Sequence, residues 1–133
     1  MTDLELIAAA RGVVRRRRSH QVEMGQVGAA ILAGSGAVYC GVCIDAPCGI
    51  GFCAEHAAIA AMVTAGESRI LAAVAVNEAG SVLPPCGRCR EFIALLDAEN
   101  RAARILLAGG RTVTLAELMP DHWIDAKSGG GWQ

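Results

Sequence analysis

The chain has 133 residues, 53% of them hydrophobic, and a formal net charge of −1 from 12 basic and 13 acidic side chains. This size and apolar content are typical of one compact domain, so we expect residues 1–133 to form a single domain with a buried core. The balanced charge excludes the strongly basic class of nucleic-acid-binding proteins and gives no indication of a membrane-surface partner.

The first residues and the length of the apolar runs predict the compartment in which the protein is found. Residues 1–5 lack the basic flank and apolar run of a secretory signal. Apolar runs such as Val27–Ala33 and Ile70–Val76 are about a third of the roughly 20 residues that cross a bilayer. We therefore expect a cytoplasmic protein without a membrane span. Disulfides are rare in that reducing compartment, so the six cysteines indicate metal or redox chemistry.

The first half of the chain predicts a helix, a β-hairpin and a second helix. Apolar residues at helical spacing after Thr2 or Asp3 predict a helix over residues 3–18 that ends in the run Arg15–Arg18. Four arginines are compatible with a phosphate-binding patch, but cations also suit a helix C-terminus, and we assign the run no function. The next predicted elements are strands over 27–33 and 37–44, joined by a glycine-containing turn, and an alanine-rich helix over 53–66.

The second half predicts a buried strand over 70–77, because this continuous apolar run is bounded by polar residues. Pro84 and Pro85 then precede a third helix that starts at Cys86. The remaining predictions are strands over 104–108 and 112–115, a helical turn over 115–119 and a loose tail after about residue 123. The alternation of strands and helices favours a three-layer α/β/α domain.

Three cysteines and one glutamate form a pattern suited to a catalytic metal. Cys86 and Cys89 have a C-x-x-C spacing at a helix start, where backbone amides and the helix dipole favour thiolates. Cys53 also begins a helix, and Glu55 follows it by two residues. A catalytic Zn²⁺ takes three protein ligands and keeps a fourth position for water. We therefore predict one Zn²⁺ per chain on Cys53, Cys86 and Cys89, with Glu55 beside it.

The order of these residues matches the pattern of zinc deaminases, (His or Cys)-x-Glu followed by Pro-Cys-x-x-Cys. It reads Cys53-Ala54-Glu55 and Pro85-Cys86-Gly87-Arg88-Cys89. In that chemistry zinc lowers the pKa of its bound water for attack on an amine-bearing ring carbon, and the glutamate carries protons to the ring nitrogen and the leaving amino group. Because three thiolates leave negative charge at the site, we expect Arg88 and His56 to offset it, with Arg88 hydrogen-bonded to a ligand sulfur.

With these motifs the chain resembles the cytidine deaminase family, including its blasticidin S deaminase branch, over nearly its full length. Other stretches similar to the family are Val27-Gly28-Ala29-Ala30, Leu83-Pro84-Pro85-Cys86-Gly87-Arg88-Cys89-Arg90 and Glu117-Leu118-Met119-Pro120. The resemblance implies a five-stranded mixed sheet between helices. It implies hydrolysis of a cytidine- or deoxycytidine-type nucleoside to the uridine-type product and ammonia, as in pyrimidine salvage. It also implies a homotetramer whose neighbouring subunits complete the active sites.

The resemblance also points to the substrate-binding positions, several of which differ here. The family carries Phe-Pro before Val-Gly-Ala-Ala and an Asn-x-Glu that holds the ribose hydroxyls, where this chain has Gly25-Gln26 and Cys43-Ile44-Asp45. We expect Asp45, Cys43 and Ala54 to line the substrate site, with Asp45 accepting a sugar hydroxyl. The family glutamine after Cys-Arg is Glu91, which favours a reshaped pocket edge or a cationic substrate. Blasticidin S or another aminated heterocycle is therefore the alternative substrate.

Other interpretations of the cysteines stay open at this point. They include buried thiols, a closed structural zinc site completed by Cys48 or His56, and a redox or zinc-storage dithiol, which leaves Cys53 and Glu55 unexplained. Cys40, Cys43 and Cys48 are expected to be ordinary buried residues, and His20 and His122 incidental. Nucleic-acid editing is disfavoured because the chain lacks a basic stripe. Trp123 and Trp132 suit either a pocket cover in a neighbouring subunit or packed C-terminal aromatics.

Overall fold

The computed structural model describes residues 1–128 of the chain. Its helices are α1 (Asp3–Val13), α2 (Ala54–Thr64), α3 (Gly87–Leu96) and α4 (Trp123–Ser128). Its strands are β1 (Arg17–Ser19), β2 (Val22–Ala33), β3 (Val38–Asp45), β4 (Ile70–Asn77), β5 (Val82–Leu83), β6 (Arg104–Leu106) and β7 (Thr112–Thr114). Short 3-10 helices, among them η1 (Pro47–Gly49) and η2 (Ala98–Ala102), lie in the connections.

A mixed sheet of seven strands lies at the centre of the described chain. β2 pairs in antiparallel fashion with β1, β3 and β4. β4 continues the sheet to β5 and, by a parallel pairing, to β6, which pairs with β7. The expectation of five strands was therefore wrong. β1 and β5 are additions to the core β3–β2–β4–β6–β7, and their three and two residues are too short to show an apolar pattern.

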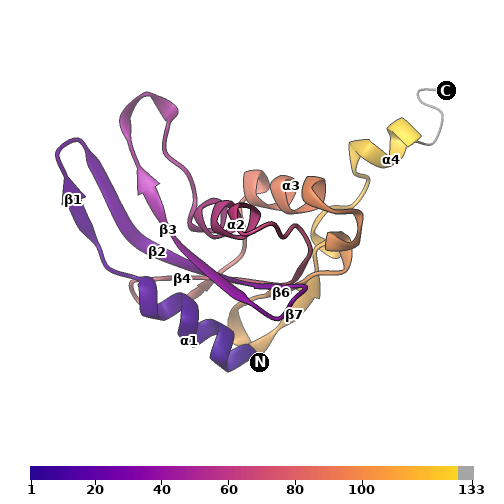
Figure 1. Cartoon of the computed structure of the whole chain (residues 1–133), viewed down its shortest axis with the longest axis horizontal. Coiled ribbons are helices and arrows are strands. Elements are labelled where there is room, and N and C mark those ends of the chain that lie inside the picture. Colours follow the sequence, from indigo (N-terminus) through magenta and orange to yellow (C-terminus); the bar gives the residue numbers. More distant parts are fainter. Residues whose placement is uncertain (129–133) are drawn as a thin grey trace.

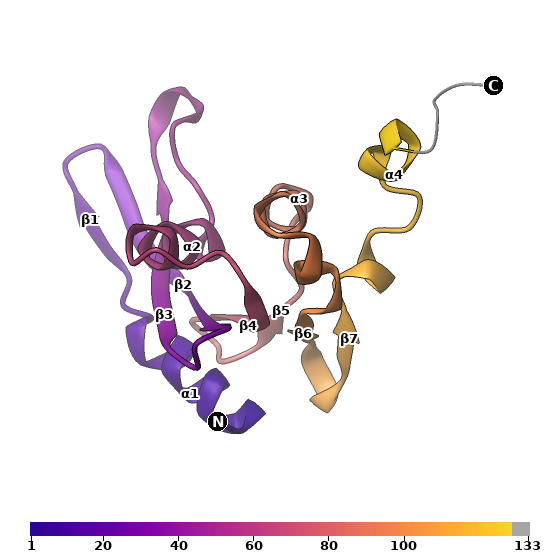
Figure 2. The ribbon, with the colours of Figure 1, turned by 45° about the vertical axis from the view of Figure 1, so that its right-hand side comes forward.

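Helices cover both faces of the sheet. α1 lies on one face, and α2 and α3 lie on the other (Figure 1, Figure 2). Alternate residues of β2 point to opposite faces: Ala29 and Ile31 pack into the core beneath α2 and α3, whereas Ala30 packs with Leu6 and Ala10 of α1. The three-layer α/β/α prediction is confirmed.

Both ends of the described chain differ from the sequence-based expectation. The helix expected over residues 3–18 ends at Val13, and β1 takes up the end of the arginine run. β1 pairs in antiparallel fashion with β2, and the side chains of Arg16 and Arg18 both form ion pairs with Glu23 of β2. The tail expected to be loose contains helix α4. Residues 129–133, including Trp132, lie outside the described residues.

Two contacts fix the helices that carry the candidate ligands. Gly41 of β3 lies so close to α2 that an added Cβ would sit 2.4 Å from the backbone nitrogen of Ala58. Asn100, which is fully buried in η2, accepts a hydrogen bond from the Ile70 backbone N–H (2.7 Å). Its amide donates to the carbonyl oxygens of Ser68 and Ile93 (3.0 Å each). Asn100 therefore ties α3 to the start of β4.

Candidate active site

Three cysteine sulfurs come together where helices α2 and α3 begin. Cys53 and Cys86 are the N-cap residues of the two helices, and Cys89 lies in the first turn of α3. The Sγ atoms of Cys53 and Cys86 are 3.4 Å apart, and those of Cys86 and Cys89 are 3.6 Å apart. All three lie within 4.8 Å of one another. The structure thus assembles the three cysteines that the spacing selects.

The sulfur group fits a zinc ion. Tetrahedral ligands with Zn–S distances of about 2.3 Å have sulfurs roughly 3.8 Å apart, close to the separations seen here. Within the described residues the group contains no fourth His, Cys, Asp or Glu ligand. Cys53 and Cys86 line a cavity, whereas Cys89 is buried. Three protein ligands beside an open cavity are the arrangement of a catalytic site and not of a closed structural one.

The three thiols differ in how readily they ionise. Burial raises the pKa of Cys89, and Glu55 and the neighbouring thiols raise it further. Burial is also the main reason that the pKa of Cys53 is raised. For Cys86 burial acts in the same direction, but hydrogen bonds from the Cys89 backbone N–H, the neighbouring thiols and the Arg88 backbone N–H leave its pKa lowered. A bound dication supplies the positive charge that the other two thiolates need.

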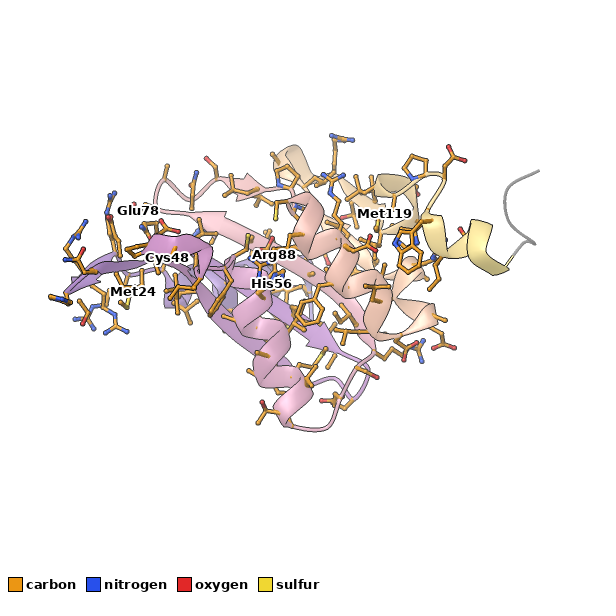
Figure 3. The ribbon with its side chains drawn as sticks, turned by 90° about the horizontal axis from the view of Figure 1, so that it is seen from above. Met24, Cys48, His56, Glu78, Arg88 and Met119 are labelled. Carbon is orange, nitrogen blue, oxygen red and sulfur yellow. The ribbon has the colours of Figure 1, made fainter. Side chains whose placement is uncertain are left out.

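The side chains of His56 and Arg88 lie near each other where α2 and α3 begin (Figure 3), and His56 contacts a sulfur of the group. The Nδ1 atom of His56 is 3.3 Å from Cys89 Sγ, and burial together with the Arg88 charge lowers the pKa of His56. Arg88 is exposed and donates to the carbonyl oxygen of Gly51 (3.2 Å). Its expected hydrogen bond to a sulfur was therefore wrong. Arg88 follows Cys86 by two positions and precedes Cys89 by one, and residues at these spacings do not face each other on a helix.

A cavity of about 580 Å³ adjoins the sulfurs. Glu55 lines it although the residue is only 6% exposed, and burial raises the pKa of its carboxyl group. A carboxyl group that holds a proton more readily is suited to proton transfer near neutral pH. Ala54 lines the cavity too, and apolar wall surface comes from Val27, Phe52, Ala75, Leu83 and Pro84. The cavity therefore offers a proton-transfer group beside apolar walls suited to a flat heterocycle.

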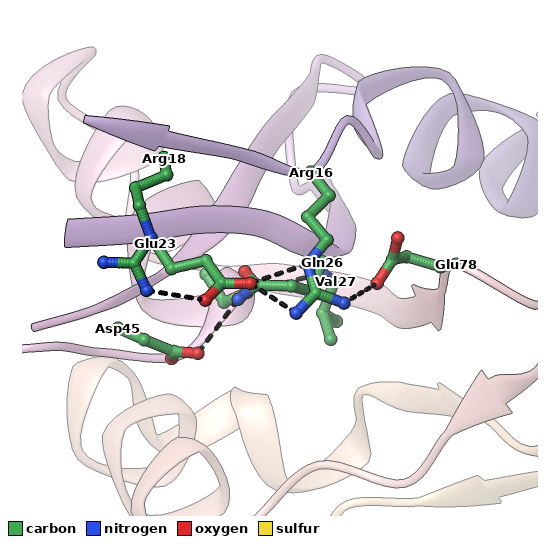
Figure 4. A network of polar contacts seen from close by, with 8 residues as sticks. Arg16, Arg18, Glu23, Gln26, Val27, Asp45 and Glu78 are labelled. Carbon is green, nitrogen blue, oxygen red and sulfur yellow. Dashed lines mark hydrogen bonds and ion pairs between the residues drawn. The ribbon is translucent and has the colours of Figure 1, made fainter.

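A second polar group of the cavity comes from strands β2 and β3 (Figure 4). Gln26 Nε2 donates to Asp45 Oδ2 (3.1 Å), and the Cys43 thiol donates to Gln26 Oε1 (3.1 Å). Asp45 and Cys43 thus line the cavity as expected, whereas Gln26 and Phe52 were missed as lining residues. Phe52 directly precedes Cys53, which was an available signal. Gln26 reaches the cavity through an irregularity of β2 that spacing does not reveal.

Comparison with known proteins agrees with this geometry. Residues 1–103 match the family described as "Cytidine and deoxycytidylate deaminase zinc-binding region". The chain belongs to this family. A cytidine deaminase of Mycobacterium tuberculosis is 37% identical over 97 residues, which are 71% of this chain and 70% of that relative. A cytidine deaminase of Halalkalibacterium halodurans is 35% identical over 98 residues, which are 71% of this chain and 74% of the relative.

Solved structures give the same family. The crystal structure of cytidine deaminase from Mycobacterium tuberculosis has a TM-score of 0.76 and 30% identity, covering 92% of this chain and 98% of that one. The cytidine deaminase from Burkholderia pseudomallei has a TM-score of 0.74 and 27% identity, covering 91% and 98%. With the cysteine group, these relatives show a zinc-dependent aminohydrolase with the cytidine deaminase fold. Across residues 1–128, none of the helices is long and apolar enough to cross a membrane.

Two residues outside the zinc site of this deaminase, Glu91 and Cys48, differ from expectation. Glu91 is not part of the cavity wall, so it does not reshape the pocket edge in the described chain. Instead it accepts a hydrogen bond from Trp123 Nε1 (2.6 Å) and lies 2.8 Å from Nε2 of His122. His122 is buried, and the hydrogen bond of Trp123 to Glu91 connects α4 to α3. Cys48, expected to be buried, is exposed in η1, because η1 is a surface loop without buried residues.

Proposed function

We propose that this chain removes the exocyclic amino group of a cytidine- or deoxycytidine-type nucleoside by hydrolysis, releasing the uridine-type product and ammonia. The observation that carries the proposal is the sulfur group of Cys53, Cys86 and Cys89 next to a cavity that also contains the buried carboxyl group of Glu55. The curated relatives are named cytidine deaminases, which supports an aminopyrimidine nucleoside as the substrate.

In the proposed reaction Cys53, Cys86 and Cys89 hold a zinc ion, which when bound makes a water molecule nucleophilic toward C4 of the pyrimidine. Glu55 takes a proton from that water, gives it to ring N3, and passes the second water proton to the leaving amino group. The water oxygen remains on C4, and the C4–N bond breaks to release ammonia. Because burial raises its pKa, the Glu55 carboxyl group can hold the proton between the two transfers. His56 contacts Cys89 and orients that sulfur.

We further propose a homotetrameric, cytoplasmic enzyme of pyrimidine salvage, as the family resemblance implies. Ile50 is 73% exposed and lies between Gly49 and Gly51, which line the cavity. A neighbouring subunit that covered Ile50 would remove this apolar side chain from water and complete the cavity mouth. Sedimentation velocity of the active protein is expected to show a tetramer, and an active monomer would contradict the proposal.

Ultraviolet absorbance tests the substrate, with zinc-loaded protein mixed separately with cytidine, deoxycytidine, cytosine and blasticidin S. We expect the aminopyrimidine band of cytidine or deoxycytidine to disappear, and the Glu55→Ala variant to leave it unchanged. A change with blasticidin S alone would support the alternative substrate, which the altered positions Gly25 and Cys43 motivate. No Glu55-dependent change with any of these compounds, at one bound zinc per chain, would contradict the proposal.

A further inference from the structure

We propose that Gln26 is a specificity-determining residue that, together with Asp45, binds a sugar hydroxyl and so selects a pentose-bearing aminopyrimidine over the free base. This inference rests on the proposed function and adds a residue that the family pattern does not supply. The family pattern has an asparagine where this chain has Cys43, and a thiol cannot replace its amide. The carboxamide next to Asp45 comes from the neighbouring strand instead.

A bulge in β2 brings Gln26 to the cavity. Between two regular β2–β3 pairs, residues 25, 26 and 27 of β2 face the single β3 residue Cys43. Such a bulge turns a side chain out of the regular alternation of a strand. Gly25 permits the bend, because its φ is +83° and an added Cβ would lie 1.9 Å from the carbonyl oxygen of Arg15. No larger residue fits at position 25, so the backbone itself determines where Gln26 points.

The Gln26 carboxamide is fixed at both ends. Its Oε1 accepts from the Cys43 thiol (3.1 Å), and that sulfur in turn accepts from the Val27 backbone N–H (3.3 Å). Its Nε2 donates to Asp45 Oδ2 (3.1 Å). Within residues 1–128, no other hydrogen bond uses the second N–H of Nε2 or the Oδ1 atom of Asp45. One donor of Gln26 and one acceptor of Asp45 therefore remain available on two hydrogen-bonded residues that both line the cavity.

A hydroxyl group is the ligand that this pair matches, because it donates one hydrogen bond and accepts another. The free base has no hydroxyl, whereas a nucleoside carries hydroxyls on the sugar attached to its ring. The cavity of about 580 Å³ includes both this pair and Glu55, so one nucleoside can engage both. Asp45 stands where the family pattern has glutamate and is one methylene shorter. The longer side chain of Gln26 offsets this loss of reach. Cys43 holds the Gln26 side chain in place through its hydrogen bonds to Gln26 Oε1 and from the Val27 backbone N–H.

Steady-state kinetics with a matched pair of nucleosides test the assignment. The substrates are cytidine and its dideoxy analogue, which lacks the two ring hydroxyls of the sugar, and the variant is Gln26→Leu. We expect kcat/KM for cytidine to fall by about 10-fold, mainly through KM, and kcat/KM for the dideoxy analogue to change by less than about twofold. Gln21→Leu is the matched control, because Gln21 is exposed in the β1–β2 turn and does not line the cavity.

Two further variants separate binding from folding. Gln26→Glu keeps the size of the side chain but replaces the donor with a carboxylate beside Asp45, so we expect the same selective loss. Adding Cys43→Asn to Gln26→Leu restores an amide near Asp45 and is expected to recover cytidine turnover. Calorimetry of cytidine binding in a Glu55→Ala background gives an independent readout, with the affinity falling by about the same factor.

The outcomes are distinct. Equal losses for cytidine and the dideoxy analogue, or no loss for either, in Gln26→Leu and Gln26→Glu would overturn the role of Gln26 while leaving the deaminase assignment in place. If the unsubstituted zinc-loaded protein turned over neither nucleoside, the proposed function would fail, and this inference with it.

Discussion

Replacing Asn100 with alanine tests how one buried side chain aligns the helices that carry the cysteines. Its amide group makes three hydrogen bonds, to the Ile70 N–H and to the carbonyl oxygens of Ser68 and Ile93. A buried hydrogen bond contributes about 1 kcal/mol net, and a partner left unpaired costs at least as much. We therefore expect the free energy of unfolding of Asn100→Ala to fall by about 3 kcal/mol, equivalent to a Tm lower by roughly 10 °C for a domain of this size.

Urea unfolding followed by circular dichroism at fixed zinc concentration measures this loss. Asn77→Ala is the control, because the Asn77 side chain accepts one hydrogen bond, from the Ser81 N–H in an exposed turn (2.9 Å), and we expect a loss below about 1 kcal/mol. Ile93 belongs to the helix that carries Cys89, so Asn100→Ala is also expected to retain zinc less well. A loss below about 1 kcal/mol for Asn100→Ala would refute the reasoning.

Four further predictions concern the zinc site and the C-terminal helix. Glu55→Gln is expected to keep one zinc per chain by metal analysis and to lose about 10²- to 10⁴-fold in deamination rate; a rate near that of the parent would count against proton transfer by Glu55. Burial raises the pKa of Glu55 in the folded state, so ionisation of its carboxyl group destabilises the fold as pH rises above the unfolded pKa of about 4.3. Urea unfolding of the zinc-free protein is therefore expected to show that Glu55→Gln becomes increasingly more stable than the parent above this pH. Cys89→Ser is expected to lose bound zinc, whereas Cys48→Ser, which changes an exposed thiol outside the sulfur group, is expected to keep it; equal zinc contents would exclude Cys89 as a ligand. The hydrogen bonds from Trp123 and His122 lower the pKa of Glu91 in the folded state. The ionised Glu91 carboxylate therefore stabilises the fold above its unfolded pKa of about 4.3, and this stabilisation is lost as pH falls through the lower folded pKa. Trp123 fluorescence in a Trp132→Phe background is expected to shift to the red on acidification, and the same shift in Glu91→Gln would argue against this cause.

The parts of the site that the sequence predicts are those determined locally. Cys53 and Cys86 are helix N-caps, and Glu55 and Cys89 lie in the first turns that follow, so a few residues of spacing determine their geometry. The strand over 70–77 and the helices after the two cysteines follow from continuous apolar runs and from prolines, which are also local signals.

The parts that the sequence does not predict depend on partners distant in the chain. The end of the arginine run pairs with β2, whereas apolar spacing alone extends the first helix through it. The position of Gln26 depends on a bulge, which shifts the alternation on which strand patterns rest. α4 is attached through Glu91 to α3, a contact that no spacing near Trp123 indicates. Charge alone favours Arg88 as the partner of a sulfur, but the direction of each side chain on its helix brings His56 to Cys89 and Arg88 to the carbonyl oxygen of Gly51.

The central claim is that the cysteine group and Glu55 hydrolyse a cytidine-type nucleoside. Mass spectrometry of the product formed from cytidine by zinc-loaded protein, in water labelled with heavy oxygen, tests it most directly. We predict uridine that carries the heavy oxygen at C4, with an equal amount of ammonia, and no product with Glu55→Ala. Unchanged cytidine, or the same amount of product from Glu55→Ala, would contradict the claim.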